Sequence, residues 1–141
     1  MRGGAASGVD VPHLIIEYSA NLDGPLDIAA LVDDVHAAAL AHGLPSLDAL
    51  RTRAVARDHY RIADGNPTHG FIALLARIGP GRSAEQKTSF LQVLMDTLEA
   101  AVAPIGPDHA VALSVEIQEI DPELRINRNH VRTRMQENPP T

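Results

Sequence analysis

The chain has 141 residues, of which 45% are hydrophobic and 21% charged, and this length and composition fit one compact domain. Its 18 acidic and 12 basic side chains give a net charge of −6, which argues against a nucleic-acid-binding surface. The absence of cysteine excludes disulfides, thiolate metal sites and thiol nucleophiles. No apolar run approaches the roughly 20 residues of a membrane span. The start of the chain lacks the apolar core of a signal peptide, so we expect a cytoplasmic protein.

Strand and helix patterns alternate from the start of the chain. The branched segment that follows Pro12 predicts a buried strand over residues 13–18, because it is short and ends at a turn-like sequence. From Leu26 the apolar residues recur at helical spacing, and the pattern stops at Gly43 before a proline. These residues therefore predict the first helix.

A second strand is predicted over residues 47–57, where polar and apolar side chains roughly alternate. Because side chains of a strand alternate between its faces, Arg51 and Arg53 should share one face. Residues 58–69 contain Asp-Gly-Asn-Pro and are expected to form a connecting loop.

The same order of elements then repeats. Residues 71–78 are strand-like, and Ser83 can cap a helix in which Gln86 completes a capping box. Apolar spacing carries this helix to about Ala103. The alternation over residues 110–120 predicts a half-buried strand.

We therefore predict an α+β fold in which two pseudo-repeated βαβ units, residues 12–57 and 70–120, form a four-stranded sheet with two helices on one face. One domain should cover residues 12–130. Residues 1–11 are expected to be a disordered leader or to follow a wrongly assigned start, and residues 131–141 a flexible tail. The uncovered sheet face predicts association with other copies of the chain.

By pattern alone, no nucleophile elbow, phosphate loop or metal triad is present. The seven histidines are scattered without ligand spacing, so no metal site is expected. Several arginines near one site of an acidic protein would suit a small anion, because the guanidinium group matches carboxylate geometry. Considered singly, Arg51, Arg53 and Arg82 are more often surface charges, and Pro12 more often simply begins an edge strand.

Five segments of the sequence favour functional roles for Pro12 and two of these arginines, Arg51 and Arg82. They are Pro-His-Leu-Ile-Ile-Glu-Tyr-Ser at 12–19, Leu-Arg-Thr-Arg at 50–53, Ala-Asp-Gly at 63–65, Ile-Gly-Pro-Gly-Arg-Ser at 78–83 and Leu-Ser-Val-Glu-Ile-Gln-Glu-Ile-Asp-Pro at 113–122. In order and spacing they resemble the 5-carboxymethyl-2-hydroxymuconate isomerase family of the 4-oxalocrotonate tautomerase superfamily. The resemblance covers nearly the whole chain after the first 11 residues.

The resemblance implies a homotrimer and an isomerase of aromatic catabolism, in homoprotocatechuate degradation, that needs no cofactor. An amino-terminal proline would move a proton between the enol oxygen and a carbon of 5-carboxymethyl-2-hydroxymuconate or a related unsaturated diacid. Carried over by position, Pro12 is the catalytic base, Arg51 and Arg82 bind carboxylate or carbonyl oxygens, and Arg53 is a weaker substrate-binding candidate.

The acid–base chemistry of proline agrees with this role. A free α-amine titrates near about 7.7–8.0, and neighbouring arginines would lower its pKa. In a continuous chain, however, the nitrogen of Pro12 belongs to an amide and is not basic. We expect translation to start at Val11, so that removal of the initiator methionine exposes Pro12; cleavage of the leader is an alternative.

Two further functions are open. The chain could catalyse another reaction of the superfamily, as a decarboxylase, a hydratase or a phenylpyruvate-type tautomerase. If the leader stays attached, it could be a non-catalytic trimeric binding protein. The expected partners are a small dicarboxylate or enol substrate and the other copies of the chain in a homotrimer, with no nucleic acid and no membrane.

Overall fold

The computed structural model describes residues 12–138, so the leader predicted at residues 1–11 lies outside the described residues. The elements in chain order are β1 (His13–Ser19), α2 (Ile28–His42), β2 (Arg51–Arg57), β3 (His69–Ile78), α3 (Ala84–Val102), β4 (Ala110–Glu119) and α4 (His130–Glu137).

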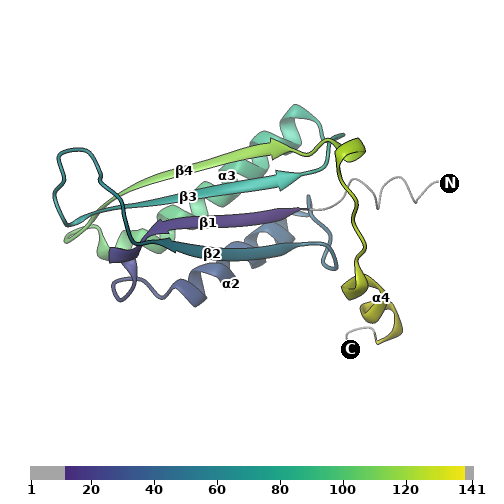
Figure 1. The fold of residues 1–141 in the computed structure, drawn as a ribbon, viewed down its shortest axis with the longest axis horizontal. Coiled ribbons are helices and arrows are strands. Elements are labelled where there is room, and N and C mark those ends of the chain that lie inside the picture. The colour runs from purple at the N-terminus through teal and green to yellow at the C-terminus, as the bar shows by residue number, and fades with distance from the viewer. Residues whose placement is uncertain (1–11, 139–141) are drawn as a thin grey trace.

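The four strands form one mixed sheet in the order β2-β1-β3-β4. β1 runs parallel to β2, β3 runs parallel to β4, and the central strands β1 and β3 are antiparallel. Helix α2 connects the first parallel pair and α3 the second, and both helices lie behind the sheet in Figure 1. The predicted α+β fold of two βαβ units is therefore confirmed.

The hydrophobic core lies between the sheet and these two helices. Every second residue of β3, from Gly70 to Ile78, is buried. Helix α3 places Phe90, Leu94 and Leu98 in the core, since residues four apart lie on the same helix face. No helix of residues 12–138 lies against the opposite sheet face, which stays partly exposed.

The ends of both long helices have identifiable caps. The side chain of Asp27 accepts a hydrogen bond from the backbone N–H of Ala30, so α2 begins just after the predicted position. Gly43 ends this helix with a φ of 90°, which glycine adopts without steric cost. The capping box of Ser83 and Gln86 is present, as predicted. Among residues 12–138, no helix combines the length and apolar character needed to span a membrane.

Strand β2 begins at Arg51, so its predicted start at residue 47 is wrong. The carbonyl of Ser46 accepts hydrogen bonds from the N–H groups of Ala49 and Leu50, each at 3.2 Å. These local bonds form a turn and keep the backbone of this segment out of the sheet. Strand β3 is longer than predicted and begins at His69.

The predicted flexible tail at residues 131–141 contains helix α4, and residues 139–141 lie outside the described part of the chain. The side chain of Asn129 caps this helix and also donates to the carbonyl of Asp48 at 2.8 Å. Arg132 makes two contacts with the Asp48 carboxylate, at 2.9 and 3.2 Å. Helix α4 is therefore held by contacts with Asp48, a residue more than 80 positions earlier in the chain. The local sequence pattern does not reveal these contacts.

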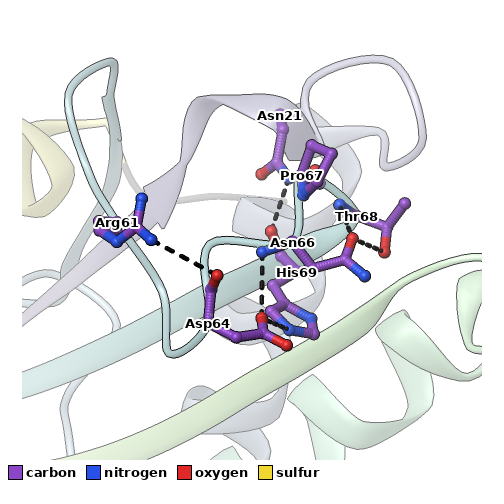
Figure 2. Close-up of polar contacts among 7 residues, drawn as sticks. All are labelled: Asn21, Arg61, Asp64, Asn66, Pro67, Thr68 and His69. Carbon is purple, nitrogen blue, oxygen red and sulfur yellow. Dashed lines mark hydrogen bonds and ion pairs between the residues drawn. The ribbon is translucent and has the colours of Figure 1, made fainter.

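The loop that leads into β3 is held by side chains (Figure 2). Oδ1 of Asp64 accepts a hydrogen bond from the N–H of Asn66 at 3.0 Å and lies 2.8 Å from Nε2 of His69. Nδ2 of Asn21 donates to the carbonyls of Pro67 and His69 at 3.1 and 2.7 Å. These bonds fix the sheet end where β1 finishes and β3 starts, which is opposite to the end where β1 begins.

Candidate active site

The strand order brings the predicted site residues to one end of the sheet (Figure 1). Pro12 directly precedes β1, Arg51 is the first residue of β2, and Arg82 follows the end of β3. His13, the first residue of β1, is paired with Arg51 on one side and with Arg77 near the end of β3 on the other. Segments that are far apart in the sequence therefore meet around the start of β1.

Pro12 is buried, and its carbonyl accepts a hydrogen bond from the N–H of Arg51 at 3.2 Å. This bond continues the pairing of β1 and β2 beyond the first strand residue. It fixes the position of the proline ring relative to the start of β2.

Arg82 lies in the connection between β3 and α3, just after Gly81, whose φ of 107° is in the region that favours glycine. Its Nη2 donates to the carbonyl of Leu44 at 3.0 Å. Leu44 belongs to the connection from α2 to β2, so Arg82 is anchored to the segment that leads to Arg51.

Arg51 and Arg53 lie on the uncovered face, on either side of the His13 ring. Nη1 of Arg51 is 3.2 Å from Nε2 of His13, and Nη1 of Arg53 is 3.0 Å from Nδ1. Burial lowers the pKa of His13, and the charges of Arg51, Arg53, Arg77 and Arg125 lower it further, to about 4. The imidazole is therefore neutral at neutral pH.

Sequence reasoning missed three residues of this cluster, His13, Arg77 and Arg125. Arg125 follows β4, and its Nη2 lies 3.4 Å from Oδ1 of Asn127. Burial, together with the charges of Arg51 and Arg77, lowers the pKa of Arg125. The alternation of β1 could have placed His13 on the face of Ile15, but the sequence carries no comparable signal for the position of Arg125.

The cluster has no acidic counterpart in the part of the chain that the structure describes. No carboxylate there lies within ion-pair distance of Arg51, Arg53, Arg77 or Arg125, whereas Arg57 and Arg132 each pair with a carboxylate. Four cations at one sheet end that have no carboxylate partner within residues 12–138 favour an anionic ligand. Residues 12–138 contain no group of acidic and histidine side chains that could hold a metal ion.

Comparisons with known proteins show the family and the fold. A family model described as 5-carboxymethyl-2-hydroxymuconate isomerase matches residues 12–135. The 5-carboxymethyl-2-hydroxymuconate Delta-isomerase of Escherichia coli is 30% identical over 121 residues, which cover 86% of this chain and 96% of the relative. A crystal structure of a 5-carboxymethyl-2-hydroxymuconate delta-isomerase superposes with a TM-score of 0.85 at 25% identity and covers 93% of this chain and 97% of that one.

A more distant structure has the same fold. A fused 4-OT wild-type symmetric trimer matches with a TM-score of 0.56 at 19% identity, over 77% of this chain and 85% of that one. At this identity the likeness concerns the fold alone. The arrangement of two βαβ units is therefore shared well beyond the more similar relatives.

Proposed function

Because the chain belongs to the 5-carboxymethyl-2-hydroxymuconate isomerase family and is an isomerase, we propose that it interconverts enol and keto forms of 5-carboxymethyl-2-hydroxymuconate or a related unsaturated diacid. Pro12 is the base in this proposal. The observation that carries it is the position of Pro12 next to Arg51, one of a cluster with Arg53, Arg77 and Arg125 that has no carboxylate partner among residues 12–138. The family match also begins at Pro12.

The proposal requires Pro12 to be the first residue of the active protein. Its nitrogen is then a secondary amine with an available electron pair, whereas in a longer chain this pair is delocalised in the amide. Translation that begins at Val11, followed by removal of the initiator methionine, would produce this amine. Burial of the ring and the nearby cations both disfavour the protonated amine, so a large fraction is basic near neutral pH.

The reaction moves one proton and needs no cofactor. The amine takes the proton of the enol hydroxyl, the electron pair of that O–H bond forms the carbonyl, and the shifted double-bond electrons take the proton at carbon. Proton return regenerates the amine. Arg51 and Arg82 bind the carboxylate or carbonyl oxygens and stabilise the negative charge of the dienolate, and Arg53 assists beside Arg51.

A homotrimer in the cytoplasm is part of the proposal. The sheet face without helices carries partly exposed apolar side chains, among them Ile15, Phe71 and Leu75, and Val55 is 37% exposed. Burial of this face between copies would remove apolar surface from water. Light scattering should give the mass of a trimer at micromolar concentration, and a stable monomer would contradict this part of the proposal.

Ultraviolet absorbance tests the reaction, because enol and keto diacids differ in conjugation. Protein with a native amino terminus, identified by intact mass, should convert the diacid enol without loss of carbon dioxide or addition of water. A phenylpyruvate-type enol should react more slowly, since it lacks the second carboxylate. Release of carbon dioxide, a hydrated product, or a clear preference for the phenylpyruvate-type enol would each contradict the proposal.

A further inference from the structure

The contacts of His13 are incompatible with its hydrogen-bonding capacity. A guanidinium group only donates, and a neutral imidazole has one N–H donor and one acceptor nitrogen. Arg51 and Arg53 nevertheless approach opposite ring nitrogens, at 3.2 and 3.0 Å. One of these contacts must therefore set an N–H group against another N–H group. Protonation of the ring would make both contacts repulsive.

Two more cations act on the same ring. Arg77 is paired with His13 across β1 and β3, and its charge and that of Arg125 lower the pKa of the imidazole. The charges of Arg51 and Arg77 act in turn on Arg125. These residues come from β1, β2, β3 and the segment after β4, so distant parts of the chain contribute to the cluster. An acceptor anion among them would accept from the imidazole N–H and from guanidinium groups, which would remove both the unfavourable contact and the uncompensated charge.

We propose that His13, Arg77 and Arg125 form a carboxylate subsite that binds one end of the diacid beside Arg51 and Arg53. This inference rests on the proposed function, which supplies the diacid. His13 takes part as a neutral donor, because its remaining acceptor nitrogen can still receive a hydrogen bond from one arginine. The subsite distinguishes diacids from monoacids and takes no part in the proton transfer.

Binding of a non-reactive diacid tests the subsite without turnover. Isothermal titration with adipate should show that Arg77→Met and Arg125→Met each weaken binding by about tenfold or more, because each removes a charge-assisted contact. Arg128→Met is the matched control, since it removes an exposed arginine of the same segment. Hexanoate should bind the original protein more weakly and respond less to the two variants.

A second measurement needs no variant. The imidazole pKa of His13, followed by NMR of the ring nitrogens, should rise from about 4 when adipate is bound, because the carboxylate offsets the positive charges of Arg51, Arg53, Arg77 and Arg125. Hexanoate at equal saturation should raise the pKa of His13 less than adipate does, because its single carboxylate is shared with the other arginines of the site. No adipate binding at millimolar concentration, or an unchanged His13 titration at saturation, would overturn the proposal.

The two proposals can fail separately. Adipate binding that shifts His13, together with no isomerisation by the Pro12-started protein, would refute the proposed function and leave the subsite intact. Efficient isomerisation, with unchanged diacid KM in folded Arg77→Met and Arg125→Met proteins, would refute the subsite and leave the function intact.

Discussion

Replacement of Arg132 by Met should weaken the attachment of helix α4 to the domain. The guanidinium makes a two-point contact with Asp48, and the two side chains are only 22% and 27% exposed. A pair of this geometry and burial contributes about 1–2 kcal/mol. The pKa of Asp48 is lowered, with its hydrogen bond to Arg132 as the largest cause. The contribution is therefore present above the ordinary carboxyl pKa of 3.8 and is lost as pH falls through the lowered value.

Hydrogen exchange at neutral pH measures this weakening directly. Protection of the α4 amides should fall about 5- to 30-fold in Arg132→Met. Arg134→Met removes an exposed arginine of the same helix and should change little. Asp48→Asn should weaken α4 similarly, and the double variant should be little worse than either single one. Unchanged protection in Arg132→Met, or additive effects in the double variant, would refute this account of the α4 contact.

The remaining predictions concern the core and the site. Leu94 is fully buried, so Leu94→Ala should lower the free energy of unfolding in urea by about 2–5 kcal/mol. Leu47→Ala, at a residue 56% exposed, should change it by less than about 0.5 kcal/mol, and equal effects would contradict the assigned core. Arg51→Ala and Arg82→Ala should each lower kcat/KM for the diacid enol. The loss of transition-state stabilisation should be about 2 kcal/mol or more, because each variant loses charge-assisted contacts to the substrate. Kinetic constants equal to those of the unsubstituted protein in both variants would show that Arg51 and Arg82 do not bind the substrate.

Most of the secondary structure could be predicted from local sequence pattern. Alternation and helical spacing predicted the strands and the two long helices. The glycine at position 43 and the Ser83–Gln86 box marked two helix ends correctly, because caps depend on a few neighbouring residues. The resemblance named Pro12 and Arg51 as site residues, and the structure joins their backbones by a hydrogen bond at the start of β1 and β2. Their roles in the reaction stay a prediction.

The turn at residues 47–50 is held by local hydrogen bonds to the carbonyl of Ser46, and the rough alternation of its side chains wrongly predicted a strand there. Features that depend on distant contacts could not be predicted from local pattern at all. Helix α4 depends on Asp48, and its polar sequence resembles a flexible tail. Arg125 joins His13 because the segment after β4 passes the starts of β1 and β2, which is a matter of topology and packing.

The central claim, that the amine of Pro12 is the base, is tested by comparing two forms of the protein. One begins at Pro12, and the other retains residues 1–11, as verified by intact mass. The Pro12-started protein should isomerise the diacid enol with a rate that rises with pH through the titration of the amine, and the extended protein should be nearly inactive although equally folded. Equal activity of the two forms, with the extension still attached, would show that another group is the base.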